Sequence, residues 1–256
     1  MTAPIDDAAA RLAVASMTRT PCAPVRDLID PADVTAAYRV QTHNVKARIA
    51  ACAHVVGRKI GLTSPAVQAQ LGVDRPDFGV LLDDMDVSHL PFVPFGRLLQ
   101  PKVEAELAFV LGADARPAYA LAALEIVDSR ISGWDITFAD TVADNASSGL
   151  FVLGDQRLDL GAFAPRDVEM TLWVDGVGVS QGRGTACLGD PLAAVAWLAE
   201  TAERLGDPLR PGDVVLSGAL GPMVDLQPDT EVRVTLSHAG GPLAALTAHI
   251  GPQEAS

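Results

Sequence analysis

The stretch Val103-Glu-Ala-Glu-Leu-Ala-Phe-Val-Leu111 places two glutamates inside an otherwise apolar run. Its Val, Leu and Phe content is typical of a β-strand, whose side chains alternate between two faces, so Glu104 and Glu106 point the same way. A solvated strand face is one interpretation of the pair. However, the apolar run continues unbroken after the glutamates, which indicates burial on both faces. Buried like charges are costly unless a cation compensates them.

Mg²⁺ and Mn²⁺ are the cations that such a pair favours, because hard cations prefer carboxylate oxygens. A metal site needs a third carboxylate. Glu125 is an acidic residue in another apolar stretch, Ala123-Leu-Glu-Ile-Val127. Spacing alone does not favour Glu125 over Asp128 or Asp135 as the third ligand.

A lysine between glycines, in Gly57-Arg-Lys-Ile-Gly61, precedes a predicted helix start at Ser64-Pro65. On a strand, Lys59 shares its face with both glycines, which leaves space around the ammonium for a substrate. The alternative is an exposed lysine on an edge strand. Free N–H groups at a helix start favour a carboxylate. Lysine and helix start together predict a pocket for a 2-oxo acid.

Three aspartates, Asp77, Asp83 and Asp84, follow in the next segment. Aspartates in loops usually form turns, but one of them close to Lys59 would relay protons. The sequence contains no phosphate loop and no dinucleotide fingerprint. Its histidines show no ligand spacing, and we assign no chemistry to them: His43, His54, His89, His238 and His249.

The composition favours a large apolar core and excludes some partners. Hydrophobic residues make up 49% of the 256 residues and charged residues only 20%, so part of the surface is expected to be hidden in an oligomer. The net charge of −13 argues against nucleic acid and anionic membranes as partners. An anionic substrate would therefore need a local positive centre.

The cysteine pattern and the hydropathy of the chain bear on its location. Cys22, Cys52 and Cys187 are odd in number and far apart, so no disulfide framework is expected. The first twenty residues lack the features of a signal peptide, and no stretch has the length of a membrane span. We therefore expect a cytoplasmic protein with no membrane partner.

Local signals predict an α+β fold. We expect a helix over residues 31–50 with Asp30 as its N-cap, a strand over 55–62 and a short helix from Ser64 to Gly72. After residue 75 the pattern changes to short strands, including a hairpin that turns at Asp175-Gly176. We expect a further helix from Asp190-Pro191 to about Gly206, and strands over 214–217 and 232–236. These signals predict a small N-terminal α+β portion (1–75) and a β-rich catalytic domain (76–256).

Six pieces of the sequence together resemble, in order, the 2-keto-4-pentenoate hydratase family of the fumarylacetoacetate hydrolase superfamily. The pieces are Gly57–Ser64, Pro76–Gly79, Val103–Leu107, Ala123–Arg130, Asp140–Ser147 and Leu216–Met223. Two departures from the family pattern are a connection between Glu106 and Glu125 about a dozen residues shorter and Asp190 in place of a histidine.

The resemblance implies a fold and a set of site residues. The fold is a mixed β-roll core, in a homo-oligomer. The implied Mg²⁺ or Mn²⁺ ligands are Glu104, Glu106 and Glu125, so the resemblance selects the third carboxylate. Lys59 is the implied acid/base residue, with Asp77 or Asp84 as its acidic partner. The substrate contacts are expected at the end of the first piece, at Leu62, Thr63 and Ser64.

The activity that the resemblance implies is the metal-dependent addition of water to 2-hydroxypenta-2,4-dienoate, giving 4-hydroxy-2-oxopentanoate in the catabolism of aromatic compounds. Ketonisation with protonation at C5 would precede addition of water at C4. A 4-oxalocrotonate decarboxylase is the alternative, because it uses the same enolate chemistry. A catalytically inactive oligomeric binding protein is a third interpretation. Asp77 beside Phe78 and the Leu216–Met223 piece favour the hydratase.

Overall fold

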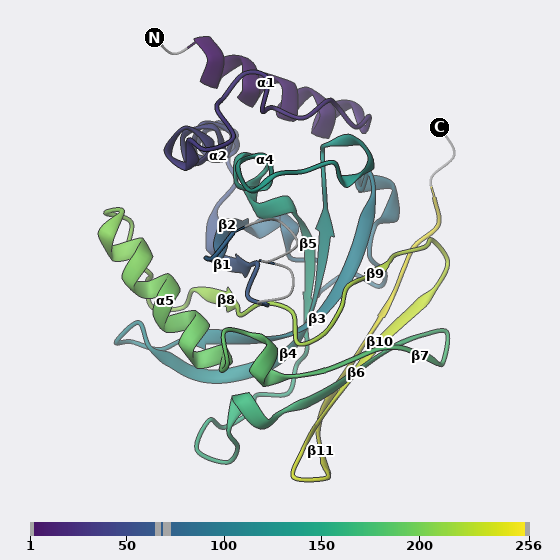
Figure 1. The fold of residues 1–256 in the computed structure, drawn as a ribbon. Helices are drawn as coiled ribbons and strands as arrows, with labels where there is room; N and C mark the ends of the chain where they lie inside the picture. The colour runs from purple at the N-terminus through teal and green to yellow at the C-terminus, as the bar shows by residue number, and fades with distance from the viewer. Residues whose placement is uncertain (1–2, 65–67, 69–72, 254–256) are drawn as a thin grey trace.

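The computed structural model describes residues 3–64, 68 and 73–253. A large sheet occupies the middle of the molecule, with a smaller sheet at one end (Figure 1). The α-helices named in the described part of the chain are α1 (Ala3–Thr18), α2 (Val34–Ala50), α4 (Phe138–Ala143) and α5 (Pro191–Arg204). The first three lie together at the end opposite the smaller sheet, whereas α5 lies beside the large sheet (Figure 1). No helix among these described residues is long and apolar enough to cross a membrane.

The large sheet is mixed, because β1 and β8 pair in parallel and its other pairs are antiparallel. Its order is β2 (Asp77–Leu82), β1 (Val55–Gly61), β8 (Val214–Leu216), β3 (Pro101–Leu111), β4 (Pro117–Asp128) and β5 (Ser148–Leu153), with β9 (Val224–Asp225) also on β3. The outer strands β2 and β5 approach each other: Val80 and Leu82 of β2 share an apolar cluster with Phe151 of β5. The sheet is therefore curled.

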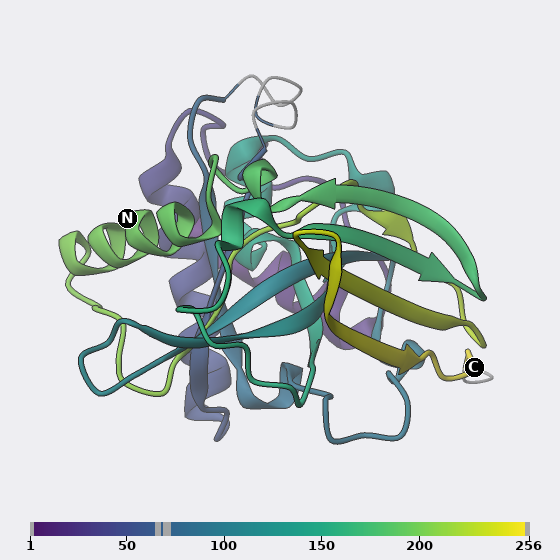
Figure 2. The ribbon, with the colours of Figure 1, turned by 90° about the horizontal axis from the view of Figure 1, so that it is seen from below.

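The smaller sheet packs on the outer face of the large sheet, as the view from below shows (Figure 2). It is antiparallel, in the order β11 (Gly241–His249), β10 (Glu231–His238), β6 (Glu169–Val174) and β7 (Val177–Arg183). Val103, Leu107 and Phe109 of β3 lie in the core between the sheets with Leu172 and Val234. The α+β fold predicted from the sequence is confirmed.

Most of the predicted elements are present. β6 and β7 form the predicted hairpin, with positive φ at Asp175 and Gly176, as a two-residue turn requires. Asp190 caps α5, because its carboxylate accepts a hydrogen bond from Leu192 N. The helix predicted from Ser64 to Gly72 lies outside the described residues, apart from Ser64 and Gln68.

Two predictions about the N-terminal helices need correction. The cap of α2 is Asp33, which accepts from Ala36 N, so the helix begins at Val34 rather than at residue 31. The Asp30 carboxylate instead accepts from Ala32 N in the turn before the helix. Helix α1 was not predicted; its inner face is made mostly of alanines, which give only a weak apolar pattern.

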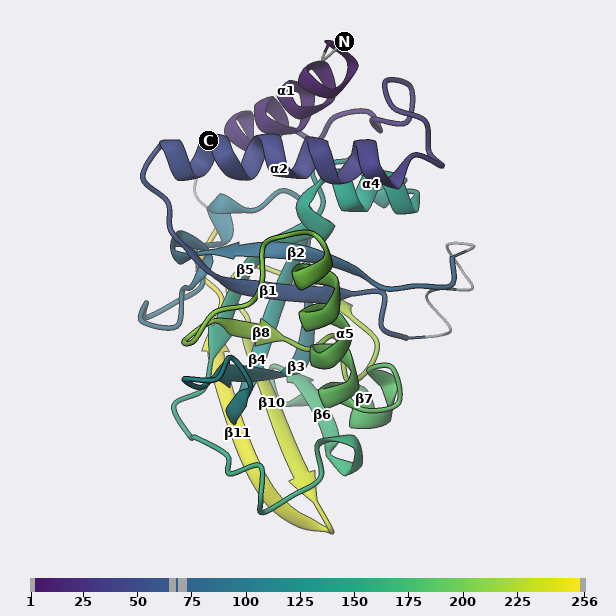
Figure 3. The same cartoon turned by 90° about the vertical axis from the view of Figure 1, so that its left-hand side faces the viewer.

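The division at residue 75 remains a prediction. Strand β1 precedes it in the sequence, yet β1 lies inside the large sheet, between β2 and β8. Lys59 is therefore on a central strand rather than an edge strand. Helices α1, α2 and α4 cover the β2 end of that sheet (Figure 3).

Candidate active site

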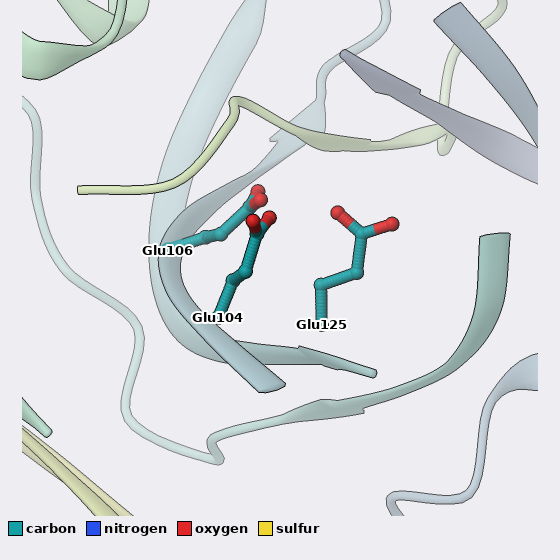
Figure 4. A group of neighbouring side chains, drawn as sticks. All are labelled: Glu104, Glu106 and Glu125. Atoms are coloured by element: carbon teal, nitrogen blue, oxygen red, sulfur yellow. The ribbon is translucent and has the colours of Figure 1, made fainter. Parts of the chain in front are cut away.

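Three glutamates converge on the inner face of the curled sheet. Glu104 of β3 lies opposite Glu125 of β4 in the antiparallel register, and Glu106 follows on the same face as Glu104. One carboxylate oxygen from each residue lies within 4.8 Å of the other two. The carboxyl groups of Glu104 and Glu106 lie side by side and face that of Glu125 (Figure 4).

The glutamates occupy a setting that suits a divalent cation. Glu106 and Glu125 are buried and Glu104 is partly buried. Among the described residues, Glu106 Oε1 and Glu125 Oε2 have no hydrogen-bond donor, while Glu125 Oε1 forms an ion pair with Lys59. Burial and the charge of Glu125 raise the pKa of Glu104 to about 7 and that of Glu106 well above its usual value. Buried, unsatisfied carboxylates of this kind fit Mg²⁺ or Mn²⁺.

The loop after β8 fixes Glu106. Gly218 N donates to Glu106 Oε2 at 2.9 Å, which leaves Oε1 free to bind a cation. Gly218 has φ +103, and a Cβ there would lie 2.4 Å from Thr63 Oγ1, so only glycine fits. Buried Cys187 Sγ lies 2.9 Å from Gly218 O and donates to it. The sequence did not predict these contacts; Gly218 belongs to the Leu216–Met223 piece, which carried the family resemblance without an assigned role.

Lys59 points into the same site. Its side chain is buried, and Nζ lies 3.1 Å from Glu125 Oε1. Burial by itself lowers the pKa of Lys59, but the charges of Glu125, Asp77 and Glu104 outweigh burial, and the pKa is raised. In the absence of a cation Lys59 is therefore an ammonium.

Asp77 is buried at the start of β2, and not in a loop as the sequence suggested. Burial raises its pKa to about 6, although Lys59 opposes the shift. A Cβ at Gly61, opposite Asp77, would lie 2.2 Å from Asp77 Oδ1, and one at Gly57 would lie 1.8 Å from Val214 O. The glycines therefore admit the Asp77 carboxyl and the β8 backbone. The prediction that they clear space for a substrate was wrong.

The other candidate aspartates lie elsewhere. Asp84, the second proposed partner of Lys59, is half exposed and accepts hydrogen bonds from Arg48 Nη2. Asp128 accepts from the backbone of Leu99 and Gln100. The side chain of Asp135 is mostly exposed and forms an ion pair with Arg26. The structure thus brings together Lys59, Asp77 and the three glutamates, and it does not bring Asp84 to them.

The predicted substrate-binding residues follow directly after β1. Leu62 adopts a positive φ of 56°, and its carbonyl accepts from Gln68 Nε2 at 2.7 Å. Thr63 is buried against Gly218, and Ser64 O accepts from Gln68 N. Contact of these three residues with a substrate remains a prediction.

The family model and the similar proteins of known name agree with one another. The model of the fumarylacetoacetate (FAA) hydrolase C-terminal family matches residues 85–251, a range that includes all three glutamates. A 2-keto-4-pentenoate hydratase of Paraburkholderia phymatum is 53% identical over 232 residues, which cover 86% of this chain and 88% of the relative. 2-Keto-4-pentenoate hydratase 2 of Dechloromonas aromatica is 49% identical over 245 residues, 91% and 94% of the two chains.

A solved structure is similar over nearly the whole chain. It is 4-oxalocrotonate decarboxylase from Pseudomonas putida G7, complexed with magnesium and adipate. The TM-score is 0.90 at 27% sequence identity, with 98% of each chain covered.

Proposed function

Because the chain belongs to the fumarylacetoacetate hydrolase family, with 2-keto-4-pentenoate hydratases as its close relatives, we propose that it is a hydro-lyase of that type. It adds water to 2-hydroxypenta-2,4-dienoate or a close analogue and forms 4-hydroxy-2-oxopentanoate, a step in the catabolism of aromatic compounds. The observation that carries this proposal is the buried contact of Lys59 with Glu125, inside a triad of glutamates.

Glu104, Glu106 and Glu125 would hold the metal, which we propose to be Mg²⁺ or Mn²⁺. When bound, such a cation would act as a Lewis acid toward the negative charge that develops on the 2-oxygen of the substrate. The magnesium complex of the similar decarboxylase supports a divalent metal in this fold. Glu106 Oε1 and Glu125 Oε2, which have no hydrogen-bond donor among the described residues, support these residues as its ligands.

Lys59 and Asp77 would move the protons. Lys59 carries a proton on a buried Nζ, and Asp77, whose pKa is raised to about 6, lies near enough to interact with it electrostatically. We propose that Lys59 delivers a proton to C5 while the 2-hydroxyl of the dienol loses its proton and becomes the ketone, and that Asp77 accepts this hydroxyl proton and returns it to Lys59. Water then adds at C4 and a proton at C3. Burial of both side chains keeps bulk water from these proton transfers.

Leu62, Thr63 and Ser64 would contact the substrate carboxylate. They follow β1 directly, three to five residues after Lys59, so the same strand positions the proton carrier and the predicted contacts. The net charge of −13 makes a local positive centre necessary for an anionic substrate.

Decarboxylation of 4-oxalocrotonate is the second candidate activity, because the TM-score of 0.90 relates the fold to a decarboxylase. Sequence identity favours the hydratase, at 53% and 49% against 27%. An inactive binding protein is disfavoured because Lys59 and all three glutamates are present.

A direct comparison of two substrates tests the proposal. Purified protein with Mg²⁺ or Mn²⁺ is given 2-hydroxypenta-2,4-dienoate, and hydration is followed by NMR of the product. In parallel, CO₂ release from 4-oxalocrotonate is measured. We expect hydration to have the larger kcat/KM, and Glu106→Gln to abolish it. Faster CO₂ release than hydration would assign the chain to the decarboxylases.

We further propose that the protein is a cytoplasmic homo-oligomer and that residues 1–75 form an N-terminal portion that contributes β1, with Lys59, to the sheet of the catalytic domain (76–256). Light scattering on the purified protein tests the first statement, since a monomer has a mass of 26.7 kDa.

A further inference from the structure

The Asp140–Ser147 piece matches the family pattern, but the site described above gives it no role. It comprises the end of α4 and the turn into β5, and it lies beside the outer edge of β2 (Figure 3). Here the two outer strands of the curled sheet approach each other. A residue in this turn can therefore connect β5 to β2.

The backbone of the turn is strained. Asn145, Ala146 and Ser147 have φ values of 55°, 53° and 52°. Asparagine adopts this left-handed region more readily than most residues, but an alanine or a serine there costs about 1–2 kcal/mol. The surroundings hold the conformation, because Ser148 Oγ donates to Asn145 O at 2.6 Å and the hydroxyls of Thr141 and Ser147 lie 3.1 Å apart. Strain maintained in this way is frequent where a protein positions functional groups.

The Asn145 side chain binds the free edge of β2. Val80 N donates to Asn145 Oδ1 at 2.8 Å, and Asn145 Nδ2 donates to Val80 O at 2.9 Å. One side chain thus satisfies both backbone groups, as a neighbouring strand would. Gly79 allows this approach, because a Cβ there would lie 2.4 Å from Asn145 O.

A second amide supports the same edge. Gln41 of α2 is buried, and its Nε2 donates to Phe78 O at 3.0 Å and to Val142 O at 3.1 Å. The backbone oxygens of Phe78 and Val80, which face the free edge of β2, therefore accept hydrogen bonds from side chains and not from a further strand.

The position of β2 decides where Asp77 lies. Gly79 is opposite Lys59 in the register with β1, and Asp77 is two residues before it on the same face. A slip of one residue would move Asp77 to the opposite face, away from Lys59. We propose that Asn145 is a positioning residue: its paired hydrogen bonds to Val80 hold β2 in the register that brings Asp77 to Lys59. This inference rests on the proposed roles of Lys59 and Asp77.

Two variants separate the hydrogen bonds from the backbone strain. Asn145→Gly keeps the left-handed conformation and removes both bonds, whereas Asn145→Asp keeps the acceptor for Val80 N and loses the donor. Asn44→Ala is the matched control, because Asn44 Nδ2 also donates to a backbone oxygen, that of Ala9 at 3.1 Å, away from β2. Each protein is compared in kcat and KM for the dienoate, in Mn²⁺ affinity, and in amide exchange of the β2 peptide.

We expect Asn145→Gly to lower kcat by about 10-fold to 10²-fold, the range for a misplaced acid/base group. KM and Mn²⁺ affinity should stay within about twofold, since the glutamates lie on β3 and β4. Amide exchange of Val80 should accelerate. Asn145→Asp should give an intermediate kcat, which a merely structural role would not predict, and Asn44→Ala should match wild type in kcat and β2 exchange.

The inference is overturned if Asn145→Gly has the kcat of Asn44→Ala, or if Val80 exchanges no faster than in wild type. If Asn145→Gly does not fold, the same criteria apply to Asn145→Asp. Absence of hydration in the wild-type protein would refute the proposed function instead, and the exchange experiment would still decide whether Asn145 holds β2.

Discussion

Replacement of Lys59 by methionine removes the ammonium from the buried carboxylate cluster while nearly preserving side-chain length. Lys59 Nζ lies 3.1 Å from Glu125 Oε1, and both side chains are at most 4% exposed. At an effective dielectric constant of roughly 20, unit charges at this distance attract by about 5 kcal/mol. Removal of one partner of a buried ion pair costs about 3–5 kcal/mol of stability in proteins. We expect Lys59→Met to destabilise the metal-free protein by that amount.

Two conditions should reduce this loss. Burial already raises the pKa of Glu104 to about 7 and that of Asp77 to about 6, and removal of Lys59 will raise both pKa values further. Proton uptake therefore relieves the repulsion at pH 6 more than at pH 8. A divalent cation replaces the missing positive charge, so Mg²⁺ should stabilise Lys59→Met more than it stabilises wild type.

The assay is urea unfolding of both proteins at pH 6 and pH 8, with chelator or with Mg²⁺, together with turnover of 2-hydroxypenta-2,4-dienoate. With the metal present, kcat should fall by roughly 10²–10⁴, the range for a positioned acid/base. An equal loss of stability with chelator and with Mg²⁺ would refute the electrostatic argument. An unchanged kcat with a raised KM would make Lys59 a substrate-binding residue only.

Three further predictions follow from the same cluster. The pKa of Glu104 is about 7 in the folded protein and roughly 4.3 in an unfolded chain, so its contribution to stability should fall as the pH rises from about 4 to about 7. In urea unfolding with chelator, the free energy of unfolding of Glu104→Gln should therefore rise relative to that of wild type between pH 5 and pH 8. A difference in unfolding free energy that stays constant over this range would contradict the raised pKa. Oxalate, which imitates a planar enolate with two adjacent oxygens, should inhibit competitively and more strongly than acetate. Equal oxalate inhibition of wild type and Glu125→Ala would exclude Glu125 as the third ligand. Asp77→Asn should lower kcat while Mn²⁺ affinity changes little, and a loss of Mn²⁺ binding measured by calorimetry would place Asp77 among the metal ligands.

The sequence predicted those parts of the site that one strand contains. Glu104 and Glu106 share a face because of strand periodicity, and the apolar residues between and after them indicated burial. Lys59 stood out because glycines flank it. The third ligand required the pairing of β3 with β4, since Glu125 meets Glu104 only through a register that local patterns do not contain.

Interactions between distant segments explain what the sequence did not predict. Gly57 and Gly61 suggested open space, but the β8 backbone and the Asp77 carboxyl fill it, and both come from other strands. The hydrogen bond from Gly218 to Glu106 and those from Asn145 to Val80 span 112 and 65 residues of sequence. Their geometry depends on how the sheet curls. Helix α1 has an inner face of alanines, whose small side chains leave little contrast with its outer face.

The metal requirement of hydration tests the central claim most directly. Protein freed of metal with chelator is titrated with Mn²⁺, and metal binding by calorimetry is compared with the rate of dienoate hydration in the same samples. We predict one Mn²⁺ per chain, no hydration before addition, and a rate that rises with occupancy, while Glu106→Gln loses binding and rate together. Full hydration by the metal-free protein, or strong binding by Glu106→Gln, would contradict the assignment of the glutamate triad as the catalytic metal site.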